Sequence, residues 1–327
     1  MTRTSTFLHA HGWEKAQQMP LAGDASSRQY IRLCSGPDRA ILMIDPQDDT
    51  GRFAQIAAHL CRVGLSAPEI IAHAPGLMLL EDFGDAQFAR IITEAPGLEP
   101  TLYRAATDVL VHLGAAHVPD GVQTATPVVL GQMIEPAIAH YIPAFGGTQE
   151  RNAADLTARL TDLLETLVPR DTILLLRDYH AENMIWLPDR AGVRRVGLLD
   201  FQDALAGPPV YDLVSMLQDA RRDVSRTCTD ATLTYYLTRS GRAEQEVLPL
   251  FHLLGLQRNL RILGVFTRLA IENGKPNYLT LIPRVWGHIQ TSLRAPASAT
   301  LAPLIDSMFP EPTVSRLRKV QDLCQTP

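Results

Sequence analysis

The sequence predicts an α+β fold in which a small, mostly antiparallel sheet precedes a larger helical part. Up to about residue 84, short apolar runs alternate with turns around a single helical pattern. Beyond residue 100, apolar residues recur instead at the three- and four-residue intervals typical of helices. The chain of 327 residues is long enough for two such parts. We therefore expect a smaller domain over residues 1–84 and a larger one over residues 85–327.

The first part is expected to contain a hairpin, one helix and two further strands. Arg28, Tyr30 and Arg32 alternate with other residues in the two-residue period of a strand. The turn residues 35–38 then lead into the apolar run 40–44, which completes the hairpin. One apolar helical face and two more short apolar runs follow, over residues 53–61, 69–72 and 77–80.

The second part is expected to be mainly helical, with one interruption. Helical spacing of apolar residues extends over residues 102–117, 155–167, 211–222, 244–273 and 279–293. Three short apolar runs, joined by polar loops, interrupt this pattern at residues 173–176, 184–187 and 196–199. We expect these runs to be short strands that present the loops between them.

Composition excludes several classes of partner. Acidic residues outnumber basic ones, for a formal net charge of −5, so neither nucleic acid nor a membrane surface is an expected partner. No apolar run approaches the length of a membrane span, and the first residues lack the apolar segment of a signal peptide. The four cysteines are far apart and form no metal or disulfide pattern. We therefore expect a cytoplasmic globular protein with reduced thiols.

Three oxygen-bearing side chains lie where predicted strands end. Asp178 and Asn183 lie in the loop between two apolar runs, and Asp200 ends the next run. Kinases orient the acceptor hydroxyl and bind Mg²⁺ with an Asp-x-x-x-x-Asn loop and a later Asp. An Asp and an Asn at this spacing also occur by chance and favour turns, but the flanking strands and the third carboxylate support the catalytic interpretation. Asp178 would then orient the hydroxyl, and Asn183 and Asp200 would bind the metal.

The chain also resembles a known family of kinases. The matching stretches include residues 20–28, 80–84, 177–186, 198–223 and 256–264. On these stretches it is similar to the aminoglycoside-phosphotransferase-like kinases of the protein-kinase superfold, and among them to the bacterial anomeric kinases of N-acetylmuramate and N-acetylglucosamine used in cell-wall recycling. The resemblance implies a protein-kinase-like fold with two lobes, a small sheet lobe for the nucleotide and a helical lobe for the acceptor.

The same resemblance implies the activity and its cofactors. With ATP and Mg²⁺, the protein would phosphorylate the anomeric hydroxyl of N-acetylmuramate or N-acetylglucosamine. A sugar-1-phosphate nucleotidyltransferase would then use the product in peptidoglycan recycling. By this resemblance a small-residue loop covers the ATP phosphates and the hinge backbone pairs with adenine. The residues concerned are Gly23, Ala25, Ser26, Ser27 and Arg28 in the loop and Glu81 and Phe83 in the hinge.

Two features depart from the usual kinase pattern. Residues 40–44 contain no lysine to pair with the phosphates, and the helix over residues 52–62 contains no glutamate to hold one. Arg28 or Arg32 could supply the missing positive charge; the alternative is that both are solvated strand arginines. The absent pair also leaves open a nucleotide-binding protein without catalysis, although such a protein would not need the three oxygen-bearing side chains.

The acceptor is expected to be a small molecule. Only a few residues separate Asp200 from the next helical pattern, which leaves no room for a protein-kinase activation segment. Asp212 in that helix is expected to be a helix N-terminal carboxylate or a brace for the catalytic loop. The nearest polar candidates for substrate binding are Tyr179, His180, Glu182, Gln202, Asp203 and Arg258.

The charge of the helical part bears on the choice of acceptor. Arginines favour an acceptor that bears a carboxylate over a polycation, although a solvated arginine face is the simpler explanation. The arginines concerned are Arg221, Arg222, Arg258 and Arg261. A kinase of the same fold with another acceptor, such as an aminoglycoside, choline or an amino alcohol, stays open as an alternative.

Overall fold

The computed structural model describes residues 2–21, 27–148 and 152–324, and its internal contacts divide the chain into two compact units. Unit 1 comprises Met1–Val109 and Ala181–Ala204, and unit 2 comprises Leu110–His180 and Leu205–Pro327. The division falls within helix α4 (Glu99–Ala115), beyond residue 84. The segment Ala181–Ala204 belongs to unit 1 because its backbone forms β-bridges to residues 66 and 87. The division into lobes at residues 84 and 85 stays a prediction.

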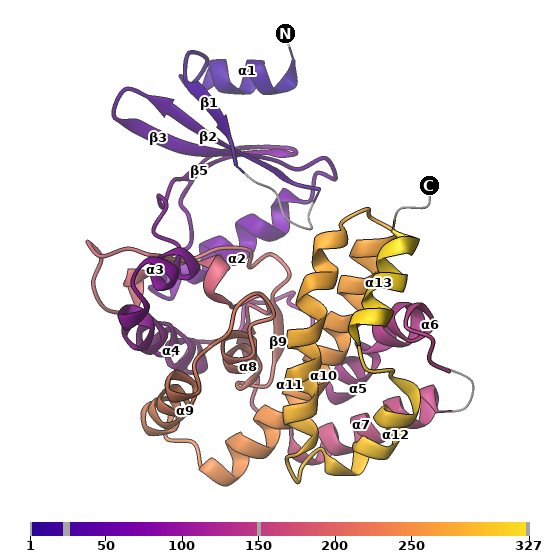
Figure 1. Ribbon diagram of the computed structural model, residues 1–327. Coiled ribbons are helices and arrows are strands. Elements are labelled where there is room, and N and C mark those ends of the chain that lie inside the picture. The colour runs from indigo at the N-terminus through magenta and orange to yellow at the C-terminus, as the bar shows by residue number, and fades with distance from the viewer. Residues whose placement is uncertain (1, 22–26, 149–151, 325–327) are drawn as a thin grey trace. The chain divides into compact units, whose positions relative to one another are not determined.

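Unit 1 is built on a five-stranded antiparallel sheet, which confirms the predicted sheet (Figure 1). Its strands lie in the order β1-β2-β3-β5-β4. A tight turn joins β2 to β3 at Gly36, whose φ of +60° is a conformation that glycine adopts without strain. The strands are β1 Gln17–Pro20, β2 Gln29–Ser35, β3 Asp38–Ile44, β4 Ile70–Ala74 and β5 Leu77–Glu81.

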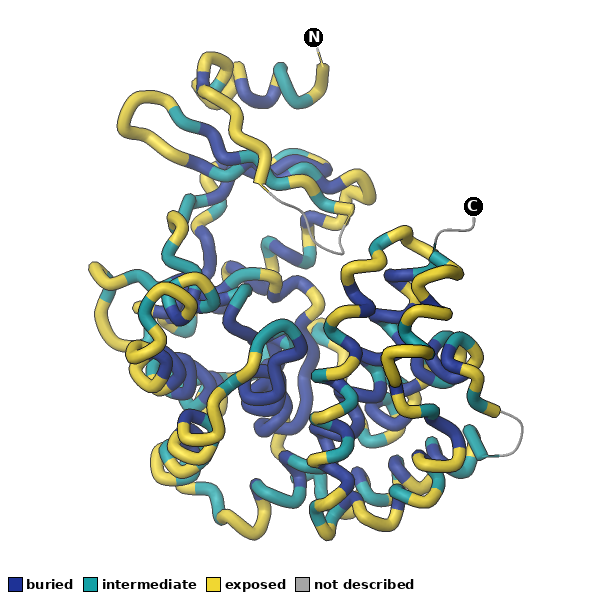
Figure 2. Tube along the Cα trace, viewed as in Figure 1, coloured by how far each residue is buried: buried dark blue, intermediate teal, exposed yellow. Residues whose placement is uncertain are grey.

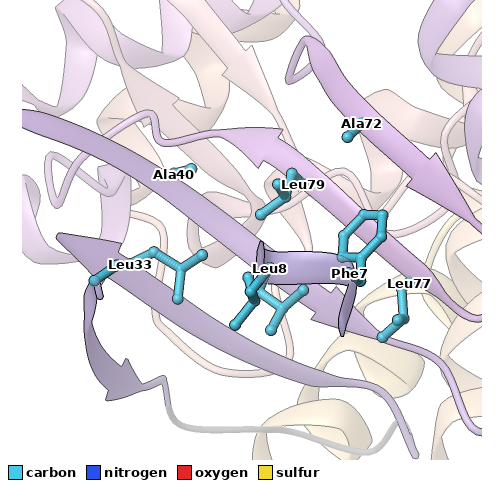
Figure 3. Packing of buried hydrophobic residues seen from close by; sticks show 9 residues of the cluster. Phe7, Leu8, Leu33, Ala40, Ala72, Leu77 and Leu79 are labelled. Carbon is cyan, nitrogen blue, oxygen red and sulfur yellow. The ribbon is translucent and has the colours of Figure 1, made fainter. Parts of the chain in front are cut away.

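One face of this sheet is covered by a helix that apolar spacing does not predict. Helix α1 (Arg3–Ala10) begins after Thr2, whose side chain accepts a hydrogen bond from the backbone N–H of Ser5 at 3.2 Å. Its Phe7 and Leu8 pack on apolar side chains of the sheet (Figure 3). These side chains are Leu33, Ala40, Leu42, Ala72, Leu77 and Leu79. With two buried residues, the helix is too short for its period to be recognised in the sequence.

The opposite face of the sheet carries the polar residues of β2. The two-residue period that directs Ile31 and Leu33 toward α1 directs Tyr30 and Arg32 to the other face. The predicted helix is present as α2 (Thr50–Arg62), and its Phe53 ring lies 4.9 Å from the ring of Phe201. The polar face of β2 and residues 201–204, which follow the predicted metal ligand Asp200, belong to the same unit.

The remainder of unit 1 consists of a short hairpin and of helices that follow the sheet. The hairpin pairs β7 (Met184–Trp186) with β8 (Val196–Leu198), and both were predicted as short strands. The helices are α3 Phe88–Glu94, the first part of α4, and the 3-10 turns η1 Pro96–Leu98, η3 Ala181–Asn183 and η4 Gly192–Arg195.

Unit 2 is mainly helical, as predicted, and holds one two-stranded sheet in which β6 (Ile173–Leu175) pairs with β9 (Leu205–Gly207). Every residue of helix α8 is buried (Figure 2). The helices are α5 Pro127–Gln132, α6 Ile142–Ala144, α7 Ala153–Leu167, α8 Tyr211–Leu217, α9 Arg226–Ser240, α10 Glu244–Ile271, α11 Ile282–Leu293, α12 Ala302–Met308 and α13 Val314–Leu323. The short turns are η2 Ala137–Tyr141, η5 Pro276–Leu281 and η6 Ala299–Leu301.

Helix α10, with 28 residues, is central to unit 2 because α7, α8, α11, α13 and η2 all pack against it. At Gly264 it approaches η2 so closely that a Cβ would lie 2.0 Å from the carbonyl carbon of Pro136. In the part of the chain that the structure describes, no helix is both long enough and apolar enough to cross a membrane.

Candidate active site

The candidate metal ligands lie at one end of the β7–β8 hairpin of unit 1. Asn183 ends the turn η3 directly before β7, and Asp200 lies just beyond β8. The pairing of Met184 with Leu198 brings these ends together, and the backbone N–H of Leu199 donates to the carbonyl of Asn183 at 3.0 Å. Asn183 Nδ2 donates to Asp200 Oδ2 at 3.4 Å. The hairpin thus places a side-chain amide beside a carboxylate, as the sequence spacing predicts.

These two side chains suit a hard divalent cation. Mg²⁺ takes one or two carboxylates from the protein and further oxygens from phosphates and water. Asp200 is exposed, and Gln202 Nε2 donates to its Oδ1 at 2.7 Å. The φ of Asp200, +57°, is a left-handed conformation that non-glycine residues rarely adopt, and such strain concentrates at functional sites. Over the described ranges, no cluster of three or more His, Cys, Asp or Glu could hold a metal. One amide oxygen and one carboxylate would leave the other ligand positions of such a cation to phosphate and water oxygens.

Ion pairs hold the predicted hinge, residues 81–83. Arg32 from β2 lies against Asp82, with Nε 2.6 Å from Oδ2 and Nη2 3.0 Å from Oδ1, and its Nη1 lies 2.8 Å from Asp85 Oδ1. Asp82 Oδ1 also accepts a hydrogen bond from the backbone N–H of Gly84 at 2.9 Å. The side chains of Arg32 and Asp82 are 10% and 4% exposed, so this pair is shielded from solvent, whereas the Asp85 side chain is 59% exposed. Arg32 is therefore engaged at the hinge instead of being a solvated strand arginine.

The side chains of Glu81 and Phe83 are likewise engaged within unit 1. Glu81 forms an ion pair with Arg190, and the guanidinium of Arg190 lies 5.0 Å from the centre of the Phe83 ring. Phe83 also packs on Gly197, where a Cβ would lie 2.7 Å from the ring. These contacts leave the hinge backbone as the part that adenine could use, so the role of the hinge in nucleotide binding stays a prediction.

The predicted phosphate loop is described only at its end. Gly23, Ala25 and Ser26 lie outside the described residues, and Ser27 is exposed. Arg28 Nε donates to Asp45 Oδ2 at 2.9 Å, in an ion pair whose side chains are 10% and 2% exposed. Burial and the negative charge of Asp200 raise the pKa of Tyr30 to about 12. Tyr30 was not among the predicted site residues, although its alternation with Arg28 indicated a shared face.

In unit 2, helix α8 braces the loop that carries Asp178. The backbone N–H groups of Leu176 and Arg177 donate to the two oxygens of Asp212 at 2.6 and 2.9 Å. Ser215 Oγ, one turn further along α8, donates to the carbonyl of Arg177 at 2.7 Å. Arg177 has a φ of +68°, a strained conformation that these bonds hold in place. The predicted bracing role of Asp212 is confirmed.

The electrostatic surroundings of Asp178 favour its ionised form. Burial acts to raise the pKa of Asp178, but His180 when protonated, Arg258, Arg177 and Arg261 together hold that pKa below its usual value. Burial also lowers the pKa of His180 to about 4, so this imidazole is neutral at pH 7. At that pH the arginines supply the positive charge that acts on Asp178. A carboxylate with a lowered pKa is a weak base that remains a good hydrogen-bond acceptor. It is suited to orienting a hydroxyl group.

The predicted substrate-binding residues are divided between the units. In unit 1, Asp203 is exposed, Gln202 is bonded to Asp200, and the Glu182 carbonyl accepts a bond from Gln87. In unit 2, the exposed fractions are 1% for Tyr179, 5% for His180 and 5% for Arg258. His180 Nε2 lies 3.4 Å from Arg221 Nη1. Because the unit 2 residues are buried, their contact with a substrate stays a prediction.

Known proteins match the chain over most of its length. The model of the phosphotransferase enzyme family matches residues 17–250. The chain is 35% identical, over 353 aligned positions, to a protein of Caulobacter vibrioides named N-acetylmuramate/N-acetylglucosamine kinase. That alignment covers 94% of this chain and 96% of the relative.

Solved structures share the fold. A choline/ethanolamine kinase family protein from Mesorhizobium loti matches with a TM-score of 0.64 at 13% identity, over 97% of this chain and 96% of that one. The aminoglycoside phosphotransferase APH(4)-Ia, in a ternary complex with ADP and hygromycin B, matches with a TM-score of 0.61 at 14% identity, over 89% of this chain and 99% of that one. At these identities the likeness concerns the fold, and it confirms the predicted kinase-like architecture.

Proposed function

Because the chain belongs to the phosphotransferase enzyme family, we propose that it transfers the γ-phosphate of ATP to the anomeric hydroxyl of N-acetylmuramate or N-acetylglucosamine. The main support is the relative that bears the name of this activity and aligns with 94% of the chain. The Asp178 loop and the paired Asn183 and Asp200 add the side chains that the reaction needs. The product would be the sugar 1-phosphate.

Asp178 would act on the attacking hydroxyl. The sugar oxygen forms a bond to the γ-phosphorus while the bond from that phosphorus to the β-γ bridging oxygen breaks, and ADP leaves. Asp178 accepts the hydrogen bond of the hydroxyl and so directs its lone pair at phosphorus. Its lowered pKa makes early proton abstraction difficult, which suits a loose transition state in which the hydroxyl proton passes to the Asp178 carboxylate late, as the new oxygen–phosphorus bond forms.

Asn183 and Asp200 would hold Mg²⁺, and Asp200 would be the stronger ligand because it carries the negative charge. When bound, the ion would neutralise charge on the β- and γ-phosphates. Arg28 stands beside the loop predicted to cover these phosphates, and its charge would serve in place of the lysine that β3 lacks. Tyr30 lies in the field of Asp200 on the same strand face and would border this site.

The charges around Asp178 support a neutral or anionic acceptor. Arg177, Arg258 and Arg261 all act on this carboxylate within unit 2. A polycationic acceptor would be repelled by these groups, whereas the carboxylate of N-acetylmuramate would be attracted. Use of the product by a sugar-1-phosphate nucleotidyltransferase, a role in peptidoglycan recycling and a cytoplasmic location belong to the same proposal.

The test is coupled ADP release with ATP and Mg²⁺ against N-acetylmuramate, N-acetylglucosamine and the 1-O-methyl glycoside of each sugar. We expect turnover with both free sugars and none with the glycosides, because the methyl group blocks the anomeric oxygen. Equal turnover with the glycosides would move the reaction to another hydroxyl. Turnover with choline or an aminoglycoside but with neither sugar would overturn the proposed acceptor.

A further inference from the structure

Arg258 of helix α10 occupies an unusual position for an arginine. Its side chain is 5% exposed, and its Nη2 donates to Ser215 Oγ at 2.8 Å. Its Nη1 is also buried and has no hydrogen-bond partner among the residues that the structure describes. A buried guanidinium with an unused donor nitrogen is costly unless nearby charges compensate it, and Arg258 lies in the field of the carboxylates of Asp178 and Asp212. Arg258 is therefore linked by charge to the carboxylate of the predicted catalytic loop and to the carboxylate that braces this loop.

The hydrogen bond from Arg258 leads directly to the catalytic loop. Ser215 Oγ accepts from Arg258 and donates to the carbonyl oxygen of Arg177 at 2.7 Å. Arg177 precedes Asp178 and has the strained φ of +68°. Asp212 holds the N–H groups of this loop, whereas the Ser215 bond holds a carbonyl, so the two contacts restrain opposite sides of one peptide segment.

We propose that Arg258 is a positioning residue, which holds Asp178 in its catalytic orientation through Ser215 and the carbonyl of Arg177. This role differs from the substrate contact that the sequence suggested for Arg258. The positive charge of Arg258 adds a second effect, because it lies among the groups that keep Asp178 ionised. The chain thus uses a residue about eighty positions later in the sequence to fix a loop of the active site.

Several charged groups face Asp178 and bear on any pH effect. His180 and Arg177 belong to its own loop, Arg258 and Arg261 come from α10, and Asp212 comes from α8. Arg261, Arg177 and Asp212 remain when Arg258 is replaced. Loss of Arg258 therefore raises the pKa of Asp178 without abolishing the positive field.

Three variants separate the hydrogen bond from the charge, and a fourth is the control. Ser215→Ala removes the hydrogen bonds between Arg258 and the Arg177 carbonyl and keeps the guanidinium. Arg258→Lys keeps the positive charge and loses the planar guanidinium, and Arg258→Met removes the charge and the hydrogen bond together. The control is Arg268→Met, which removes an exposed arginine from the same helix. The inference rests on the proposed function for its assay, so the activity measurements use the amino sugars, and hydrogen exchange of the peptide over residues 174–181 supplies a second measurement that needs no substrate.

We expect kcat to fall by about tenfold in Ser215→Ala and more in Arg258→Met, with KM for ATP and for the sugar nearly unchanged, because the lost contact orients the catalytic group. Exchange at residues 174–181 should quicken in both variants and not in Arg268→Met. The acid limb of kcat should move to higher pH in Arg258→Met and stay in place in Ser215→Ala and Arg258→Lys, where the charge remains.

Three results would overturn the proposal. Losses confined to KM for the sugar would make Arg258 a substrate contact. A large loss of thermal stability in Arg258→Met, with normal kcat and exchange in Ser215→Ala, would make it a structural residue. Unchanged exchange in both Ser215→Ala and Arg258→Met would exclude a positioning role, whether or not the protein phosphorylates amino sugars. A wild type that phosphorylates no amino sugar would count against the proposed function and not against the positioning role.

Discussion

The Asp178 loop of unit 2 and the Asn183–Asp200 pair of unit 1 are close in sequence but are built differently. Three side-chain hydrogen bonds from α8 hold the backbone of residues 176 and 177, and Asp212 and Ser215, which make them, are fully buried. Asp200 is exposed, lies two residues beyond a three-residue strand, accepts a hydrogen bond from Gln202 at 2.7 Å and contacts Asn183 at 3.4 Å. Under the proposed function, a group that orients a hydroxyl would be held by the protein, whereas ligands of Mg²⁺ could stay open because the ion and its phosphates would complete their geometry.

The largest effect that would test this comparison is expected at Asp178. Asp178→Ala should lower kcat by about 10² to 10⁴, the usual contribution of a positioned acid-base group, with KM for ATP unchanged. Coupled ADP release measures both constants. Asp189→Asn, an exposed carboxylate of unit 1, is the control and should behave as the wild type. Turnover near the wild-type rate in Asp178→Ala would remove this residue from the mechanism.

A second prediction concerns the pair formed by Asn183 and Asp200. Asp200→Asn removes the charged ligand, so the Mg²⁺ concentration for half-maximal activity should rise by about tenfold or more, since ligand charge governs affinity for hard cations. Removing Mg²⁺ with a chelator should abolish the activity of the wild type. A magnesium titration of ADP release gives the midpoint, with Asp189→Asn as the matched control. A midpoint that does not move would place the metal elsewhere.

A third prediction concerns how the burial of His180, in the braced loop, makes the stability of the fold depend on pH. The pKa of His180 is lowered to about 4 by burial, so the unfolded chain binds this proton more tightly than the folded chain between pH 4 and 6.5. The wild type therefore gains stability relative to His180→Gln as pH rises through this window, by about 3 kcal/mol in total. Urea unfolding of both proteins at several pH values measures the difference. A constant difference would show that His180 is accessible to protons in the folded protein.

Asp212 acts in the opposite direction over nearly the same window. Burial raises the pKa of Asp212 to about 6, although its carboxylate accepts hydrogen bonds from two backbone N–H groups. Ionisation of Asp212 therefore destabilises the fold as pH rises from about 4 to 6. In the wild type, this loss offsets the gain from His180. The stability of His180→Gln should consequently decline with rising pH in this range while that of the wild type changes little.

The smallest effect is expected at the hinge. Gly197→Ala would place a methyl group 2.7 Å from the Phe83 ring, so the ring and the hinge must shift. We expect KM for ATP to rise a few-fold and the free energy of unfolding to fall by about 1–3 kcal/mol, as for other overpacked sites. Gly192→Ala is an unsuitable control because its φ of +58° adds strain, but Gly51, with open space around it, is suitable. An unchanged KM would show that the hinge adapts without affecting the nucleotide.

Local patterns in the sequence predicted several of the elements and singled out three candidate site residues. The two-residue period gave the β2–β3 hairpin, helical spacing gave α2 and α10, and the positions of Asp178, Asn183 and Asp200 relative to short apolar runs indicated their chemistry. Such information lies within a few residues along the chain, where period and turn residues report it directly. Helix α1 was missed because two buried residues give no measurable period.

Only the tertiary structure decided which distant groups meet. The sequence does not distinguish the roles of Arg32 and Arg258. In the structure, Arg32 is paired with Asp82 and Asp85, whereas Arg258 donates to Ser215, which in turn donates to the carbonyl of Arg177. The displaced pKa values of Asp178, His180 and Asp212 likewise depend on burial and on charges from other helices. These properties arise from packing between elements far apart in the chain, and a carboxylate or an imidazole has no shifted pKa until that packing removes it from water.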